Sequence, residues 1–169
     1  MSIAIRGATP ADDGPVGDLL VEAYQSQYAL KMPDVVLPEG RITDLRDQAS
    51  RRAIATVLVG EDEGVVVGTV ALYRWGAPTS EAWIPGAVDL RLLAVAASHR
   101  GRGVAEKMLD ETERLGREWE APALSLHVRR GAEGVARLYT RRGYERDPSG
   151  DIDHSSALFL DAYVLPLRR

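Results

Sequence analysis

The fold is decided by the stretch Leu92–Ala105, which reads LLAVAASHRGRGVA. An apolar run typical of a buried strand leads into a turn of glycine and arginine, and a segment with helical periodicity follows. Gly101 and Gly103 allow backbone conformations that other residues avoid, and they let a ligand approach the backbone closely. Arg100 and Arg102 add positive charge and fork-shaped donors. Because the first turn of a helix also offers unpaired N–H groups and the positive end of its dipole, the stretch predicts an anion site that best matches phosphate.

A solvated turn would use the same residues, with glycine for its geometry and arginine for solubility. The position between a strand and a helix favours the phosphate site over that alternative. Two other phosphate-binding motifs are excluded, because the chain contains neither Gly-x-x-x-x-Gly-Lys-Ser/Thr nor Gly-x-Gly-x-x-Gly.

Apolar and β-branched runs predict strands, and apolar positions three and four residues apart predict helices. The predicted strands are Ile3–Arg6, Ala55–Val59, Val65–Tyr73, Val88–Val95, Ala123–Val128 and Ala157–Leu165. The predicted helices are Val16–Tyr28 after a capping sequence at Thr9–Asp12, Ile42–Ala53, Val104–Trp119 and Glu133–Arg142. The order strand–helix–strand over residues 88–128 implies a right-handed crossover and a parallel pair, whereas the hairpin over residues 55–73, with its turn at 61–64, implies antiparallel pairing. We therefore expect one mixed α/β domain over residues 1–169, with helices on both faces of the sheet.

Composition narrows the functional classes. The chain has 169 residues, of which 45% are hydrophobic and 27% charged, and this suits a folded soluble domain. It contains no cysteine, which excludes disulfides, thiol nucleophiles and cysteine-ligated zinc. Its three histidines lie far apart in the sequence, so we expect no metal site. The formal net charge of −4 argues against a nucleic-acid partner. No apolar run approaches the roughly 18 residues that span a bilayer, and no secretory signal is evident, so we expect a cytoplasmic protein without a membrane partner.

The glycine-arginine stretch resembles motif A of the GNAT N-acetyltransferases, Gln/Arg-x-x-Gly-x-Gly/Ala, in the form Arg100-x-x-Gly103-x-Ala105. Val135–Tyr144 resembles the second motif of that family, in which Leu-Tyr is followed by a glycine and an aromatic residue. The close resemblance covers residues 88–144, and residues 3–73 are similar to the N-terminal half of the family in layout.

This resemblance implies a fold, a cofactor and a reaction. The fold is a central mixed, mostly antiparallel sheet with a parallel, splayed strand pair and helices on both faces. The cofactor is acetyl-CoA, and the reaction moves its acetyl group to a primary amine of a small molecule or peptide by direct attack in a ternary complex. The loop amides would bind the pyrophosphate, and the preceding strand would pair with the pantetheine arm. The residues that the resemblance implies as cofactor-binding are Leu93, Ala94, Val95, Arg100, Gly101, Arg102, Gly103, Val104 and Ala105.

Ala132 is a departure from the family pattern, which often has an asparagine six residues before the leucine of Leu-Tyr. One polar contact to the cofactor is therefore absent or replaced. This leaves open a second class of function, a non-catalytic acyl-CoA-binding regulatory module on the same fold. A third option, a toxin-type acetyltransferase of aminoacyl-tRNA, favours a basic surface, and the net charge of −4 speaks against it. The oligomeric state stays open, with a homodimer as one option.

The reaction needs one group that takes a proton from the amine and another that protonates the departing thiolate. The resemblance assigns the second task to Tyr139, which periodicity alone would place as an aromatic in the core. Asp89 is the best candidate for the base, because it is a carboxylate inside an otherwise apolar strand and some family members carry a glutamate base at the matching place. The alternative is an exposed aspartate at an edge or one paired with Arg91, and His127, Glu81 or water could serve as the base instead.

The acceptor side is expected to be an acidic and aromatic mouth for a cationic amine. In the resembling fold, the first helix and the loop before the central strand border the acceptor, and here these segments carry Tyr28, Trp75, Glu81 and Trp83. A carboxylate would attract an ammonium group, and aromatic faces would add cation–π attraction of about 0.5–2 kcal/mol. The alternative is that the tryptophans pack on the core and that the carboxylate is solvated. Three charged residues either line the acceptor side or belong to a solvated loop, namely Asp151, Asp153 and His154.

Overall fold

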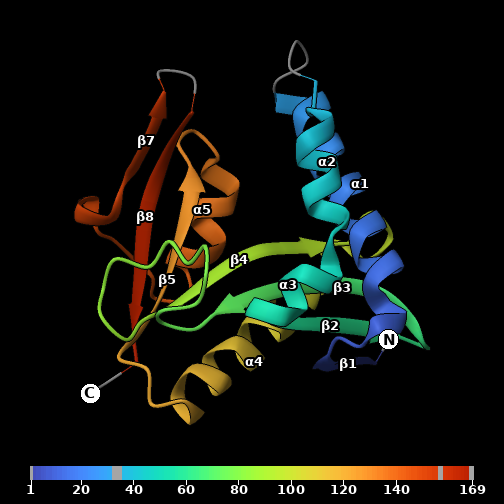
Figure 1. Cartoon of the computed structure of the whole chain (residues 1–169), viewed down its shortest axis with the longest axis horizontal. Coiled ribbons are helices and arrows are strands. Elements are labelled where there is room, and N and C mark those ends of the chain that lie inside the picture. The colour runs from blue at the N-terminus through green and yellow to red at the C-terminus, as the bar shows by residue number, and fades with distance from the viewer. Residues whose placement is uncertain (1, 32–35, 156–157, 168–169) are drawn as a thin grey trace. The chain divides into compact units, whose positions relative to one another are not determined.

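The computed structural model describes residues 2–31, 36–155 and 158–167. The chain divides into two compact units, and Figure 1 labels their elements where there is room. The first unit comprises residues 1–71 and 92–111, and the second comprises residues 72–91 and 112–169. The single domain expected over residues 1–169 stays a prediction, and each unit is described by itself.

The first unit carries the N-terminal helices and strands. Its complete elements are β1 (Ile3–Gly7), α1 (Asp13–Lys31), α2 (Glu39–Arg46), α3 (Gln48–Ile54) and β2 (Thr56–Asp62). It also holds most of β3 (Val65–Tyr73), the second half of β4 (Val88–Val95) and the first half of α4 (Val104–Glu118). β1 pairs antiparallel with β2, from Ile3 opposite Asp62 to Gly7 opposite Leu58.

Helices cover both faces of the strands in the first unit. Val59 of β2 belongs to a buried cluster with Leu20 of α1 and Leu45 of α2. The next residue, Gly60, faces α4, because a Cβ built at Gly60 would lie 3.0 Å from the sulfur of Met108. Successive residues of a strand point to opposite faces. Therefore α1 and α2 pack on one face and α4 packs on the other (Figure 1).

The chain enters α1 through the predicted capping sequence. A 3-10 turn, Pro10–Asp12, precedes the helix. The carboxylate of Asp12 accepts hydrogen bonds from the backbone N–H of Thr9 and from the guanidinium of Arg6, both at 2.7 Å. These hydrogen bonds, led by that of Arg6, hold the pKa of Asp12 down at about 2. The cap thereby ties the start of the helix to β1.

Two helices stand where periodicity predicted one over Ile42–Ala53. α2 ends at Arg46 and α3 begins at Gln48, because Asp47 adopts a non-helical conformation with φ −81° and ψ 67°. The Asp47 carboxylate then accepts a hydrogen bond from the backbone N–H of Ser50 at 3.3 Å, which caps α3. The spacing of the apolar residues continues across this break, so the pattern alone did not reveal it.

The hairpin of β2 and β3 is tighter than the sequence predicted. β2 continues to Asp62, so the predicted turn over residues 61–64 shrinks to Glu63 and Gly64. These two residues have φ of 49° and 81°. Positive φ at both central residues is the geometry of a two-residue hairpin turn that matches the twist of its strands.

The second unit carries the C-terminal strands. It begins with the end of β3, a loop over residues 74–87 and the first half of β4, and it holds the second half of α4. Its complete elements are β5 (Ala123–Arg129), α5 (Glu133–Thr140), β6 (Glu145–Arg146), β7 (Ile152–Ser155) and β8 (Leu158–Pro166). β4 pairs parallel with β5 at only two positions, Val88 opposite Leu124 and Asp89 opposite Ser125.

The remaining strands of this unit pair antiparallel. β5, β6 and β7 each pair with β8. Followed through hydrogen-bonded neighbours, the strand order is β1-β2-β3-β4-β5-β8-β6, with β7 also on β8. The predicted mixed, mostly antiparallel sheet with one parallel pair is confirmed.

β6 and β7 were not predicted. β6 has two residues and β7 reads Ile-Asp-His-Ser, so neither shows the β-branched alternation that marks a strand. Both form because β8 offers them a partner. The predicted first residue of the last strand, Ala157, lies outside the described residues.

Candidate active site

The predicted phosphate loop lies in the first unit, between β4 and α4. After Val95 the chain makes a 3-10 turn, Ala97–His99, and α4 begins at Val104. Gly101 and Gly103 have φ of 73° and 82°, in the left-handed region that favours glycine. Apart from chain neighbours, no described atom lies within 4 Å of a Cβ built at either glycine. The backbone conformation therefore favours glycine at both positions, and the space beside them is open.

Two contacts within the first unit hold this loop in place. The backbone N–H of Ala96 donates to the carbonyl oxygen of Val67 on β3 at 2.8 Å. Nε2 of His99 lies 2.8 Å from Oδ2 of Asp62, the last residue of β2. The loop is thus attached to both strands of the hairpin.

The start of α4 offers donors to an anion. The first hydrogen bond of the helix runs from the N–H of Lys107 to the carbonyl of Gly103 at 3.1 Å, so the amides of the preceding residues point out of the helix end. Arg100 and Arg102 are exposed beside them, and Nε of Arg100 also donates to the carbonyl of Val95 at 3.3 Å. Backbone amides, a helix dipole and two guanidinium groups together suit a phosphate.

β4 is distorted just before this loop. Leu92 has φ of 58°, a left-handed conformation that costs a residue with a Cβ roughly 1–2 kcal/mol. Its side chain packs against the buried cluster of the first unit, which helps to hold the backbone there. Leu93–Val95 follow directly, and with Arg100–Ala105 they complete the predicted cofactor-binding set in this unit.

Asp89 lies on the first half of β4 in the second unit and is wholly buried. Its Oδ2 accepts a hydrogen bond from the backbone N–H of Glu81 at 2.8 Å, and its Oδ1 has no partner among the described residues. Burial raises the pKa of Asp89 to about 7, and the Glu81 amide and the charge of Arg91 oppose that rise. Asp89 is thus not an exposed edge residue. A carboxylate that exchanges its proton near neutral pH suits a general base.

Tyr139 lies in α5 and is 6% exposed. Its ring meets the ring of Tyr144 edge-on, with centroids 5.3 Å apart and planes at 67°. The hydroxyl of Tyr144 is buried without a hydrogen-bond partner among the described residues, and burial raises its pKa well above the usual value. The edge contact helps to hold the Tyr139 ring. Sequence reasoning missed this neighbour, although the glycine-aromatic pair of the second motif was the available signal.

Trp83 packs within the second unit. Its indole N–H donates to Oδ2 of Asp147 at 2.8 Å, and its ring centroid lies 5.2 Å from that of His127. A Cβ at Gly150 would lie 2.2 Å from the indole, so the ring rests directly against that glycine. Nε2 of His127 lies 2.7 Å from the carbonyl oxygen of Gly150 and must carry a proton there, because a carbonyl only accepts.

The other predicted acceptor residues have different surroundings. Oε1 of Glu81 lies 3.4 Å from the guanidinium of Arg91, so its charge is already balanced. Trp75 is 50% exposed in the same loop. Tyr28 belongs to α1 of the first unit, and its side chain lies outside the described part of the structure. The structure therefore groups three of the four residues in one loop and gives Glu81 and Trp83 protein partners.

Of the three charged residues predicted near the C-terminus, one forms ion pairs and two are exposed. Asp151 forms ion pairs with Arg146 at 2.6 Å and with Arg130 at 3.9 Å, and the hydrogen bond from Arg146 lowers the pKa of Asp151. Asp153 and His154 are exposed on β7. Asp151 therefore stabilises the second unit through these ion pairs, whereas Asp153 and His154 are exposed to solvent.

Ala132 is the N-cap residue of α5 and makes no side-chain capping hydrogen bond. An asparagine at an N-cap accepts a hydrogen bond from the helix start. Where the family often has an asparagine, the start of α5 therefore has no side-chain cap.

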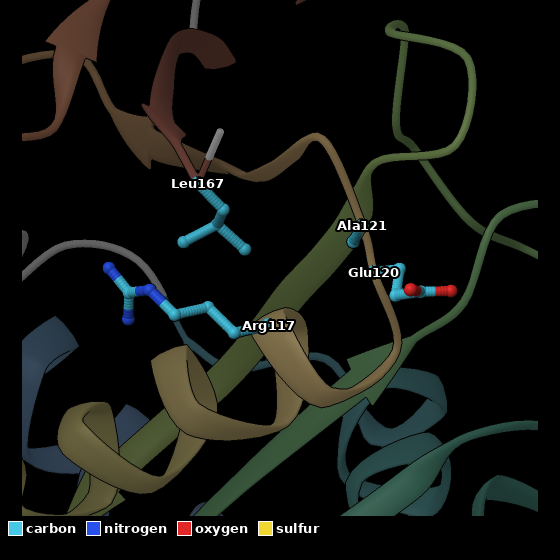
Figure 2. A pocket seen from close by; sticks show the side chains of 4 residues that line it. All are labelled: Arg117, Glu120, Ala121 and Leu167. Carbon is cyan, nitrogen blue, oxygen red and sulfur yellow. The ribbon is translucent and has the colours of Figure 1, made fainter. Parts of the chain in front are cut away.

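A shallow depression in the second unit contains none of the predicted site residues. It is lined by Arg117, Glu120, Ala121 and Leu167. Figure 2 shows the Arg117 and Glu120 side chains pointing away from one another, so they do not converge on a common ligand. Within the described residues, no group of three or more histidine, aspartate or glutamate side chains could hold a metal ion. In the same part of the chain, no helix is both long and apolar enough to cross a membrane.

A glycine-rich loop at a strand–helix junction, on a mixed sheet with one parallel pair, agrees with a comparison of the chain with family models. The family model of the Acetyltransferase (GNAT) family matches residues 17–144. The chain therefore belongs to the GNAT acetyltransferase family. A comparison with curated proteins finds no match.

Solved structures of such proteins share the fold. A GNAT-family acetyltransferase from Staphylococcus aureus Mu50 is 15% identical, with 99% of this chain and 100% of that chain covered and a TM-score of 0.73. YncA from Salmonella typhimurium, solved with its cofactor acetyl-CoA, is 19% identical, with 100% and 96% covered and a TM-score of 0.65. The PaiA N-acetyltransferase from Thermoplasma acidophilum, solved in complex with coenzyme A, is 14% identical, with 96% and 98% covered and a TM-score of 0.70. At these identities the likeness shows the fold.

Proposed function

We propose that this chain transfers an acetyl group from acetyl-CoA to a primary amine of a small molecule or peptide, by direct attack in a ternary complex. The observation that carries the proposal is the loop at the start of α4, where Gly101 and Gly103 adopt positive φ beside open space. Membership of the GNAT family supports acetyl transfer. The acetyl-CoA and coenzyme A bound by YncA and PaiA support the choice of cofactor.

The first unit is assigned the binding of acetyl-CoA. The amides of Arg100–Ala105 and the guanidinium groups of Arg100 and Arg102 would hold the pyrophosphate, and the backbone of Leu93–Val95 would pair with the pantetheine arm. The fit of the pyrophosphate to this loop rests on the helix dipole and on the lack of any side chain at Gly101 and Gly103, because a phosphate must approach the backbone there.

The second unit is assigned the two proton transfers. Acetyl-CoA supplies the acetyl group as a thioester. The amine nitrogen forms a bond to the acetyl carbon while the carbon–sulfur bond breaks. Asp89 takes the proton that the amine loses, and its pKa of about 7 suits that task at neutral pH. Tyr139 gives its hydroxyl proton to the departing sulfur.

The acceptor surface is assigned to the loop over residues 74–87 of the second unit. Trp75 offers an exposed aromatic face to an ammonium group. Glu81 and Trp83 would support that loop through their contacts with Arg91 and Asp147. The expected acceptor is therefore a cationic amine.

A two-stage assay tests the proposal. Calorimetry first measures binding of acetyl-CoA to the whole chain, and thiol release is then followed with polyamines, aminoglycosides, amino acids and peptides that have a free N-terminus. We expect binding, release that depends on the amine, and an acetylated product by mass spectrometry. Binding without release for any amine would instead favour the non-catalytic module. No binding of acetyl-CoA would overturn the proposal.

A further inference from the structure

Arg91 makes three contacts within the second unit that the proposed reaction does not use. Nη1 donates to the carbonyl oxygen of Thr79 at 2.9 Å. Nη2 lies 3.4 Å from Oε1 of Glu81. The guanidinium carbon lies 5.1 Å from the ring centroid of Tyr73, over its face. The Arg91 side chain thus contacts the loop over residues 74–87 at two residues and packs on a buried aromatic ring.

The loop that Arg91 contacts contains one residue in an unfavourable backbone conformation. The N–H of Ser80 donates to the carbonyl of Ala77 at 3.2 Å, which closes a turn with Pro78 and Thr79 at its centre. Thr79 has φ of 64°, at the turn position that usually needs glycine. A β-branched residue in the left-handed region is strained and persists only where its surroundings hold it. The hydrogen bond from Arg91 to the Thr79 carbonyl supplies such a hold.

The loop leads directly to the buried carboxylate. Two residues beyond Thr79, the N–H of Glu81 donates to Oδ2 of Asp89 at 2.8 Å. Asp89 and Arg91 stand two apart on β4, so both side chains leave the same face of the strand. We propose that Arg91 is a positioning residue, which clamps the Thr79–Glu81 segment so that the Glu81 amide stays hydrogen-bonded to Asp89. This inference rests on the proposed function, in which Asp89 is the base.

The clamp determines how readily Asp89 holds a proton. The charged groups that act on its carboxylate are Arg91 on its own strand and Glu81 on the loop, while the paired position on β5 holds the neutral Ser125. The Glu81 amide and the Arg91 charge lower the pKa of Asp89, whereas the Glu81 carboxylate raises it. Arg91→Gln should therefore raise the pKa of Asp89, and Glu81→Gln should lower it. Opposite shifts from the two halves of one ion pair would not follow from a general loosening of the fold.

The experiment titrates the Asp89 carboxyl carbon by NMR in the whole chain without cofactor, and it records the pH profile of kcat/KM for the same variants. For Arg91→Gln we expect the Asp89 titration to move up by about one pH unit. The acid limb of kcat/KM should move with it, which gives roughly tenfold lower kcat/KM at pH 6. Glu81→Gln should move both curves down, and Arg91→Lys, which keeps the charge, should move them up less than Arg91→Gln does.

Arg114→Gln is the matched control. Arg114 forms an exposed pair with Glu118 at 3.4 Å, so its loss should leave the Asp89 titration unchanged. An unchanged Asp89 titration in folded Arg91→Gln would overturn the clamp. If that variant does not fold, Arg91→Lys decides, because it keeps the positive charge but loses the paired contacts with Thr79 and Glu81, and the absence of an upward shift there would overturn the clamp as well. A shift of the carboxyl titration without any shift of the acid limb would support the clamp and exclude Asp89 as the base. Failure of the clamp can therefore be distinguished from failure of the proposed function.

Discussion

Gly68 on β3 packs closely against Val104, the first residue of α4, so that a Cβ at Gly68 would lie 2.9 Å from Cγ1 of Val104. Both residues belong to the first unit. The missing side chain lets the start of the helix approach the strand. The same helix start carries the amides that are proposed to bind the phosphates of acetyl-CoA, so this packing sets where those amides lie.

Gly68→Ala should therefore weaken acetyl-CoA binding. The added methyl group must displace Val104, and overpacking of this kind costs about 1–3 kcal/mol. We expect a raised Kd for acetyl-CoA by calorimetry and a Tm that falls by roughly 2–4 °C for each kcal/mol. Gly7→Ala is the control, because its Cβ would meet no described atom within 4 Å. A destabilised Gly68→Ala that binds acetyl-CoA as tightly as the wild type would contradict the role given to the helix start.

Gly103→Val should abolish acetyl-CoA binding and leave the chain folded. The substitution strains a backbone with φ of 82°, and it fills open space that the phosphates would need. Gly76→Val is matched to it, since Gly76 has φ of 85° and equally open surroundings. Both variants should lose about 1–2 kcal/mol of stability. Only Gly103→Val should lose affinity in calorimetry, and equal affinities would remove the loop from the cofactor site.

Tyr139→Phe should fold, bind acetyl-CoA and turn over slowly. Only the hydroxyl is lost, so the edge contact with Tyr144 persists. General acid catalysis typically contributes about 100- to 10,000-fold to the rate, and we expect kcat to fall within that range. Tyr144→Phe is the matched control. Because its buried hydroxyl has no partner among the described residues, its removal should leave kcat unchanged and maintain or raise the Tm. A kcat for Tyr139→Phe within about threefold of the wild type would exclude Tyr139 as the acid.

Activity should fall on the acid side of neutrality. Asp89 has a pKa of about 7 and must be unprotonated to act as the base. We expect kcat/KM to drop tenfold for each pH unit below about 7. Steady-state rates between pH 5 and 9 measure this. A profile that stays flat down to pH 5 would show that another group, or water, takes the proton.

Asp89→Asn should be inactive and yet more stable at alkaline pH. The folded chain keeps a proton on Asp89 that the unfolded chain, with a pKa near 4, has already lost. Stability from this group is therefore highest below about pH 4 and falls as pH rises to about 7, by as much as about 4 kcal/mol. Urea unfolding at pH 8 should show a gain for Asp89→Asn of up to that size. The gain should be much smaller at pH 5, and equal gains at both pH values would contradict the raised pKa.

Sequence patterns predicted well where the cause is local. The bounds of β4 were predicted in full, and α4 was predicted to within one residue, because apolar spacing and glycine act over a few neighbouring residues. The positive φ of Gly101 and Gly103 follows from the same kind of local preference. The resemblance to two family motifs added the cofactor and the reaction, which periodicity alone does not indicate.

Prediction was weaker where a strand or a side-chain contact depends on a partner from another segment of the chain. β6 and β7 exist because β8 pairs with them. The hydrogen bond from Trp83 to Asp147 joins residues that lie 64 apart in the chain. None of these partners could be identified from the neighbouring sequence.

The amino-acid sequence by itself determined the GNAT-type fold and the glycine-rich loop that precedes α4, because motif spacing and backbone preference are properties of short segments. Only the tertiary structure decided the chemistry of Asp89. The sequence shows a carboxylate in an apolar strand, but its pKa depends on complete burial, on the amide of Glu81 and on the charge of Arg91. Desolvation and electrostatic interaction depend on distances in space, and these are set when the loop folds back against the strand.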